Sequence, residues 1–207
     1  MPELRSCDGK AGRAFGRAVV SFWLGGCLLA ACGSETRPVV PSMAFEVDPR
    51  RLGAPIEALE LGLRFQPPLA WEQLATSDVD SVDRALGEGP VGFTPRYVFL
   101  DSTNGSLLSV ATMHFADSLT FDERVVYFGN LLADRFPGDT LRQGQYLKDN
   151  IHIAQYLLEP PGLVIFKLLF ESSLHETLQF DYIVPRAEYP GQIKAIESSI
   201  GSIALLR

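Results

Sequence analysis

The histidines are the residues whose chemistry is easiest to test against sequence spacing. The chain has three, His114, His152 and His175, and none lies four residues from another, the spacing that lets two imidazoles on one helix bind one metal ion. His175-Glu176 begins like the zinc motif H-E-x-x-H, but Gln179 stands where the second histidine is needed. We therefore expect no metal site. His175 is expected in a solvent-facing turn, and the other two histidines in ordinary strand positions.

The acidic and glycine-rich stretch 75–95 is the next candidate for ligand chemistry. Asp78, Asp80 and Asp83 are spaced like part of a calcium loop, but an EF-hand requires glycine at the position that Asp83 occupies. A G-x-G-x-x-G sequence at 87–92 lacks the preceding apolar strand and the following helix that phosphate binding requires. We expect solvated charges in a short helix followed by a flexible loop, and no cofactor.

Serine and mixed acid–base clusters offer no clear catalytic signature. No serine has the G-x-S-x-G surroundings of a hydrolase nucleophile, and the serine pairs at 172–173 and 198–199 are expected near a turn and on a helix. Because catalytic triads assemble from distant residues, this leaves hydrolysis open. A shared cleft for His152, Tyr156 and Asp181 would favour an enzyme, whereas scattered positions would count against one. We assign no catalytic residue.

The cysteines indicate a modification rather than catalysis. Arg13 and Arg17 precede an apolar run of 14 residues, 18–31, which is followed by Cys32. The run is too short for a membrane-spanning helix, which needs about 20 residues, and the order of basic, apolar and small residues is that of a secretory signal. The sequence Leu29-Ala30-Ala31-Cys32 resembles the lipobox of bacterial lipoproteins. This resemblance implies a diacylglycerol thioether on Cys32, cleavage before it and acylation of the new amino group.

Processing at this position would change the thiol content and the charge of the chain. Cys7 and Cys27 would be removed with the leader, so that no thiol would remain for a disulfide, a metal or a nucleophile. The residues after 31 include 14 basic and 23 acidic side chains, a balance that argues against nucleic-acid binding and is repelled by anionic lipids. Attachment to the membrane would therefore depend on the lipid. Gly33 in place of aspartate favours the periplasmic face of an outer membrane, if the cell has one.

The remaining chain has the composition of one folded domain with a leading tether. Of its 207 residues, 46% are apolar, enough for a domain that needs no metal or disulfide for stability. Four prolines and little periodicity between 33 and 55 predict an extended tether of up to ~3.3 Å per residue. We assign 1–31 to the signal peptide, 32–55 to a lipidated N-terminus and flexible tether, and 56–207 to the domain.

Hydrophobic periodicity predicts strands and two helices in the domain. Thr120-x-x-Glu123 has the form of a capping box, and apolar residues at helical spacing follow it until Pro137. Isoleucines recurring between 193 and 203 predict a final helix. Short apolar or alternating segments predict strands at 59–65, 97–100, 107–114, 141–147, 151–158, 163–170 and 178–184. Lys167 is the only polar residue of its segment, as in a strand covered on both faces. The short turns predict an α+β fold with an antiparallel sheet flanked by helices.

Three features of this chain resemble the PsbP-like α/β/α sandwich. They are the Phe65-x-Pro-Pro-x-x-Trp71 turn, the amphipathic helix before the meander, and an ending that combines 180–185, Tyr189 and 196–203. The resemblance covers roughly 59–206. It implies an antiparallel sheet between helices and a binding or assembly role, and it transfers no catalytic residue. A function taken from fold alone is an analogy.

The expected function is therefore that of a lipid-anchored, non-catalytic protein that binds or assembles a complex in the cell envelope. Its expected partners are the membrane, through the lipid on Cys32, and an envelope protein, with no nucleic acid. A carrier or sensor of a small or apolar ligand, held between sheet and helix, is the alternative; an envelope hydrolase is less favoured. Tyr146, Tyr156 and Tyr189 are the aromatic residues that could line a groove.

Overall fold

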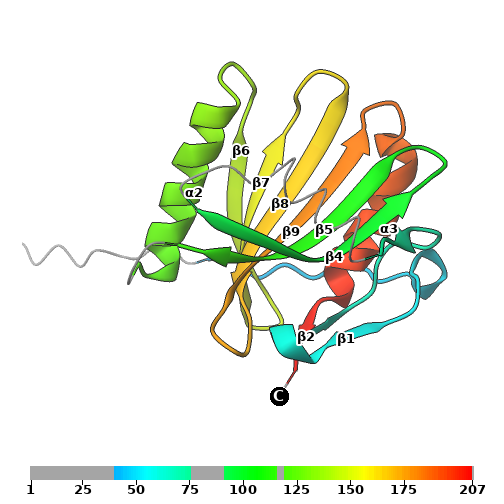
Figure 1. Cartoon of the computed structure of the whole chain (residues 1–207), viewed down its shortest axis with the longest axis horizontal. Coiled ribbons are helices and arrows are strands. Elements are labelled where there is room, and N and C mark those ends of the chain that lie inside the picture. The colour runs from blue at the N-terminus through cyan, green and yellow to red at the C-terminus, as the bar shows by residue number, and fades with distance from the viewer. Residues whose placement is uncertain (1–39, 76–90, 116–118, 207) are drawn as a thin grey trace, which may run out of the picture. The chain divides into compact units, whose positions relative to one another are not determined.

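The computed structural model describes residues 40–75, 91–115 and 119–206. Seven antiparallel strands form the main sheet in the order β3-β4-β5-β9-β8-β7-β6 (Figure 1). The strands are β3 (Glu72–Gln73), β4 (Gly92–Asp101), β5 (Ser106–His114), β6 (Arg142–Lys148), β7 (Ile151–Leu158), β8 (Leu163–Glu171) and β9 (Thr177–Pro185). The predicted antiparallel α+β class is confirmed. The central position belongs to β9, which pairs with β5 on one side and with β8 on the other.

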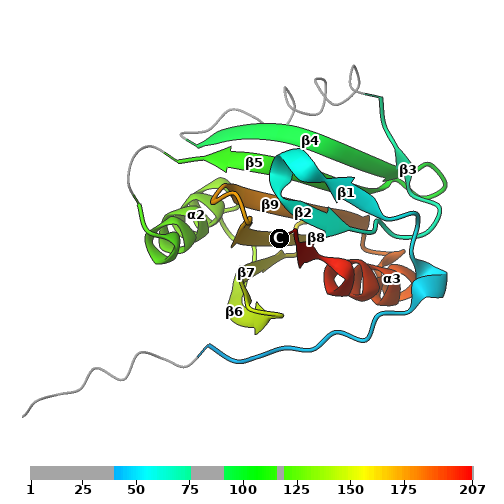
Figure 2. The same ribbon diagram turned by 90° about the horizontal axis from the view of Figure 1, so that it is seen from below.

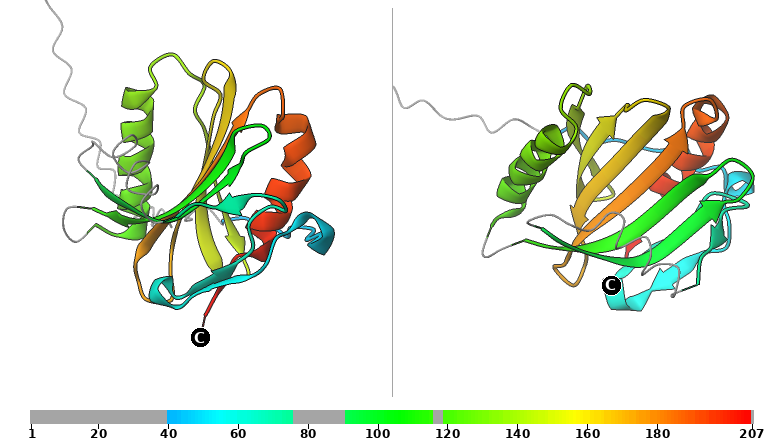
Figure 3. Two further views of the ribbon diagram at one scale, coloured as in Figure 1. Left: turned by 45° about the vertical axis from the view of Figure 1, so that its right-hand side comes forward. Right: turned by 45° about the horizontal axis from the view of Figure 1, so that its top comes forward.

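Two helices pack on opposite faces of this sheet (Figures 2 and 3). Alternate residues of β8 show the division: Leu168 belongs to the core cluster under α3 (Tyr189–Ser202), and Leu169 to the cluster under α2 (Phe121–Arg135). This alternation follows from the period of two in a strand. Neither helix in the described part of the chain has the length and apolar character needed to cross a bilayer.

The predicted start of α2 is confirmed by its hydrogen bonds. Thr120 Oγ1 accepts from the Glu123 backbone N–H at 3.4 Å, and Glu123 Oε2 accepts from the Thr120 N–H at 2.7 Å. These two bonds pair N–H groups that a helix start leaves without partners. The helix buries Val125, Phe128 and Leu132 against the sheet, the face that its periodicity predicts.

The predicted strand at 59–65 is wrong in its first half. Residues Leu59–Leu61 form a 3-10 helix, and only Leu63–Phe65 form a strand, β2. Gly62 separates them with a φ of 64°, a left-handed conformation that glycine adopts without steric penalty. Strand β2 pairs with β1 (Ile56–Ala58) and β10 (Ala204–Leu205) in a small second sheet. The apolar alternation was misleading because Leu59 is exposed.

Residues 40–55, assigned above to the flexible tether, lie against the domain. The Met43 N–H donates to Leu147 O at 2.8 Å, and the Leu147 N–H donates to Pro41 O at 2.9 Å. Farther along, the Phe45 ring lies 5.7 Å from that of Tyr146. The predicted boundary between the tether and the domain, at residue 55, therefore lies too far along the chain. The physical reason is that β6 ends the sheet, and this segment pairs backbone groups that an edge strand would otherwise expose.

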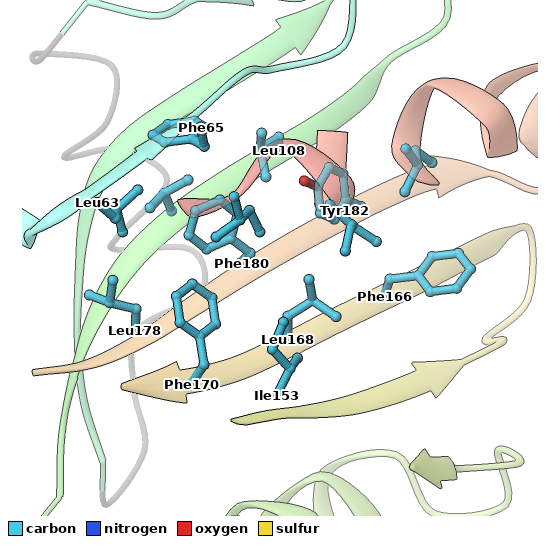
Figure 4. Packing of buried hydrophobic residues seen from close by; sticks show 14 of the residues in the cluster. Leu63, Phe65, Leu108, Ile153, Phe166, Leu168, Phe170, Leu178, Phe180 and Tyr182 are labelled. Atoms are coloured by element: carbon cyan, nitrogen blue, oxygen red, sulfur yellow. The ribbon is translucent and has the colours of Figure 1, made fainter. Parts of the chain in front are cut away.

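The core under α3 is rich in aromatic side chains (Figure 4). Phe180 of β9 lies 5.2 Å from the ring of Phe65, nearly perpendicular to it, and 5.4 Å from that of Phe170. Beside them, Ser199 of α3 lies 2.9 Å from the Tyr182 hydroxyl oxygen and donates to Gln66 O at 2.6 Å. Burial raises the pKa of Tyr182, because the charged phenolate is disfavoured away from water. This cluster joins β2, β9 and α3.

Substitutions at two glycines of α3 test whether residues 40–55 pack against the domain. A Cβ at Gly201 would lie 2.7 Å from Val47 Cγ2 and 2.8 Å from Phe45 Cβ, whereas one at Gly191 would meet nothing within 4 Å. We expect Gly201→Ala to lower the free energy of unfolding by about 1–3 kcal/mol through overpacking. Gly191→Ala is expected to be neutral or stabilising by up to about 1 kcal/mol. Urea unfolding measures both effects.

Amide hydrogen exchange provides the local control for this comparison. Gly201→Ala should accelerate exchange at Met43, whose N–H bonds to β6, and Gly191→Ala should leave it unchanged. Equal protection of Met43 in the two variants would contradict the packed arrangement.

Candidate functional site

The structure brings two of the three histidines together: His114 and His175 line one pocket with Arg124 and Glu176, whereas His152 lines another. His175 lies in an exposed turn with a φ of 62°, as predicted, and His114 ends β5. His152, in β7, places Nε2 2.8 Å from Gln145 Oε1, and its ring lies 5.0 Å from that of Phe121. Across the three described ranges, no group of three or more His, Cys, Asp or Glu side chains could hold a metal ion.

His152, Tyr156 and Asp181, whose presence in one cleft would favour an enzyme, do not share a cleft. Tyr156 is buried, and its hydroxyl donates to Val125 O at 2.6 Å. Burial also raises the pKa of Tyr156. His152 lines one pocket with Phe121, while Asp181 lines a separate cavity beneath α2. These positions count against the catalytic arrangement considered above.

Serines and tyrosines named above mainly have structural contacts. Ser198 Oγ accepts from the Asp48 N–H at 3.1 Å, and Ser172 Oγ accepts from two backbone N–H groups of its turn. The expectation of a tyrosine-lined groove is wrong for Tyr146, which is buried in the core under α3, and for Tyr156. Tyr189 is partly buried, with its ring 5.7 Å from that of Phe166.

Two sequence candidates fall outside the described residues. Cys32 is one of them, and the acidic residues Asp78, Asp80 and Asp83 are the other. Only the end of the glycine-rich sequence is described: Gly92 begins β4. The lipidation of Cys32 therefore stays a prediction.

A cavity of about 120 Å³ lies between α2 and strands β4, β5, β8 and β9. Its lining is mostly apolar and includes Phe93, Met113, Phe128, Leu131, Leu132 and Ile183. Four polar side chains complete it: Arg135, Lys167, Gln179 and Asp181. An apolar recess with a few convergent polar groups is the usual form of a small-molecule site. It is therefore the candidate functional site.

A buried ion pair lies in the wall of this cavity. Lys167 Nζ donates to Asp181 Oδ2 at 2.6 Å, and Gln179 Nε2 donates to the same oxygen at 2.6 Å. Asp181 is 2% exposed and Gln179 is 3% exposed. Such a pair is strongly destabilised when one partner is removed, because the other charge stays buried without compensation.

Two oxygens of this cluster have no hydrogen-bond partner among the residues that the structure describes. Asp181 Oδ1 and Gln179 Oε1 are both buried and unpaired. Ser109, the cross-strand neighbour of Asp181 on β5, also has an unpaired Oγ. Buried polar atoms in folded proteins nearly always have a partner, so a group of unpaired acceptors requires an explanation.

Strand register is what assembles this cluster. Lys167 of β8 and Asp181 of β9 are direct cross-strand partners, although 14 positions separate them in the sequence. Sequence reasoning missed the pair because it treated Lys167 only as an interruption of an apolar strand. An opposite charge at the matching position of the following strand is the signal that identifies such a pair.

Comparisons with known proteins bear on the fold. Neither a protein-family model nor a curated protein matches this sequence. Among solved structures, the chain is similar to the solution structure of cyanobacterial PsbP (CyanoP) from Synechocystis sp. PCC 6803. The sequence identity is 14% and the TM-score 0.52, with 86% of this chain and 98% of that chain covered. The protein therefore has a PsbP-like fold, as the sequence resemblance implied.

A double-mutant cycle tests the buried pair. We expect Lys167→Met and Asp181→Asn each to lower the free energy of unfolding by about 3 kcal/mol, because each leaves a buried charge or its partners uncompensated. The double variant should lose clearly less than the sum of the two, since neither charge remains. Urea unfolding measures all four chains.

An exposed pair in the same protein supplies the control. Lys194 and Glu197 of α3 are joined at 2.9 Å, but their side chains are 68% and 41% exposed. Lys194→Met should change stability by no more than about 0.5 kcal/mol. Additive losses at Lys167 and Asp181 would show that the ion pair does not couple them.

Proposed function

We propose that this protein is a lipid-anchored component of a bacterial cell envelope whose PsbP-like domain acts by binding rather than by catalysis. The lipobox-like sequence ending at Cys32 supports the anchor. A PsbP-like fold is compatible with a binding or assembly role, and the partner would be an envelope protein at the membrane surface. In a cell with an outer membrane, the periplasmic face of that membrane is the favoured location, because Gly33 follows the cysteine.

The observation that carries this proposal is where the packed chain begins. Backbone pairing to β6 starts at Pro41, so only a short stretch separates Cys32 from the domain. Eight residues to position 40, at ~3.3 Å each, reach at most about 26 Å. A lipid on Cys32 would thus hold the domain close to the bilayer, where a partner in or on the membrane lies within reach.

Charge supports a lipid rather than an electrostatic attachment. The chain after residue 31 has 14 basic and 23 acidic residues, and anionic headgroups repel such a domain. Two or three acyl chains provide stable anchoring, since each buried CH₂ contributes ~0.8 kcal/mol. The membrane association proposed here therefore depends on one residue.

Cysteine substitutions in the leader test the anchor. The full chain is produced in a bacterium that is fed alkyne-labelled palmitate, and label incorporation and the intact mass are measured. The unaltered chain and Cys27→Ala should carry the label and begin at Cys32. Cys32→Ala should carry no label. Cys27→Ala is the matched control because it alters the other cysteine close to the same processing position.

Two results would contradict lipidation at Cys32. One is label that persists in Cys32→Ala. The other is an unaltered chain whose mass shows an unmodified cysteine or a different N-terminus.

A second candidate function is the carriage or sensing of a small ligand. The cavity beneath α2 favours it, because an apolar lining surrounds buried oxygens that lack partners. This function is compatible with an anchor at Cys32 but does not require one.

A further inference from the structure

We propose that the cavity between α2 and the sheet binds a small, largely apolar molecule that carries a neutral hydrogen-bond donor, such as a phenol or another alcohol. The inference deepens the second candidate function and is independent of lipidation. Three properties of the cavity support this proposal. They are its volume, the buried oxygens in its wall that lack hydrogen-bond partners, and the mutual neutralisation of Lys167 and Asp181.

The volume of the cavity matches about one ring. The cavity measures about 120 Å³, and an engineered apolar cavity of about 150 Å³ binds benzene. Phe93 and Met113 from the sheet and Phe128 and Leu131 from α2 supply apolar walls. An apolar ring would therefore exchange water for contacts with these side chains.

The unpaired acceptors select a donor on the ligand. Gln179 and Asp181 line the cavity, and one oxygen of each, Gln179 Oε1 and Asp181 Oδ1, lacks a partner among the described residues. Both oxygens are covered by their neighbours, so the proposed ligand reaches them through a movement of the Gln179 or Asp181 side chain. The two donors that bond to Asp181, Lys167 Nζ and Gln179 Nε2, both serve its Oδ2, and the hydroxyl of Ser109 on the neighbouring strand makes no bond to either free oxygen. A hydroxyl that donates to either free oxygen would remove the unfavourable state of a buried acceptor without a partner.

Charge favours a neutral ligand. The Lys167 ammonium and the Asp181 carboxylate are joined at 2.6 Å and cancel each other, so neither serves as the counter-charge of an entering ion, which would lose its hydration. An anion would also face the two unpaired oxygens. Arg135 also lines the cavity. Its positive charge makes anions the alternative class of ligand, and the experiment below distinguishes anions from neutral molecules.

A matched ligand series tests the proposal. Fluorine NMR measures the binding of para-fluorophenol, para-fluoroanisole and para-fluorobenzoate to the full chain carrying Cys32→Ala, which removes the site of the proposed lipid. The phenol and the anisole share the ring, but the methyl ether has no donor. We expect the phenol to bind at least about tenfold more tightly than the anisole, as a hydrogen bond to a charged acceptor provides. The benzoate should bind more weakly than the phenol.

The series also defines the contrary results. Equal affinities for phenol and anisole would remove the role of the unpaired oxygens. A tighter benzoate would assign the cavity to anions. Absence of saturable binding of the phenol would show that the cavity does not bind this class of molecule. Each of these results overturns the proposal, and none bears on the anchor at Cys32.

Two tryptophan substitutions on α2 place the binding site. Leu131 is half-buried and lines the cavity, whereas Val126 is 61% exposed on the same helix and is not part of the lining. Leu131→Trp should fill the cavity and weaken phenol binding by at least about tenfold. Val126→Trp should leave the affinity within about twofold. Circular dichroism verifies that both variants fold, and unchanged phenol affinity in a folded Leu131→Trp chain would overturn the proposed location.

Discussion

The pairing of β9 with both of its neighbours is the interaction on which the rest of the structure depends. The strand pairs with β5 from Thr177 to Ile183 and with β8 along its whole length. It thereby joins a hairpin formed early in the chain to the late meander. Because strand side chains alternate, this register directs Phe180 and Tyr182 to the α3 side and Gln179 and Asp181 to the α2 side. A shift of β9 by one residue would exchange these two sets of side chains. It would place Gln179 and Asp181 in the aromatic core under α3.

The two faces of the sheet consequently have different properties. Under α3, aromatic rings and the hydrogen bonds of Ser199 fill the interior and join β2, β9 and the helix. Under α2, the buried surface includes an ion pair, Lys167–Asp181, and oxygens without partners beside a cavity. Buried charge is a poor source of stability compared with packed apolar side chains. The α3 side buries one ammonium, Lys148, which donates to Ile203 O at 2.8 Å, whereas the α2 side combines its ion pair with unpaired oxygens and a cavity. We interpret the α3 face as the structural core and the α2 face as the functional one.

The sequence predicted the long elements well and the short ones poorly. The helix that begins after Thr120 and the strands of the meander have many residues of one periodicity, which makes their patterns distinct from chance. The 59–65 segment failed because the alternation counted Leu59, which is exposed, as a core position, and because Gly62 carries the deciding backbone conformation. The 40–55 segment failed because its proline content suggested a tether, while its pairing depends on a strand a hundred residues later. The cavity was not predicted for a similar reason. The pairing of Lys167 with Asp181 depends on the register between β8 and β9, and the strand patterns alone do not define that register.

The most direct test of this account is a high-resolution crystal structure of the Cys32→Ala chain with para-fluorophenol. The account predicts the ring between α2 and the sheet, with its hydroxyl within hydrogen-bonding distance of Asp181 Oδ1 or Gln179 Oε1 and with the Lys167–Asp181 pair intact. A ligand bound elsewhere would contradict the account. So would a cavity closed by protein side chains, with both oxygens bonded to protein groups.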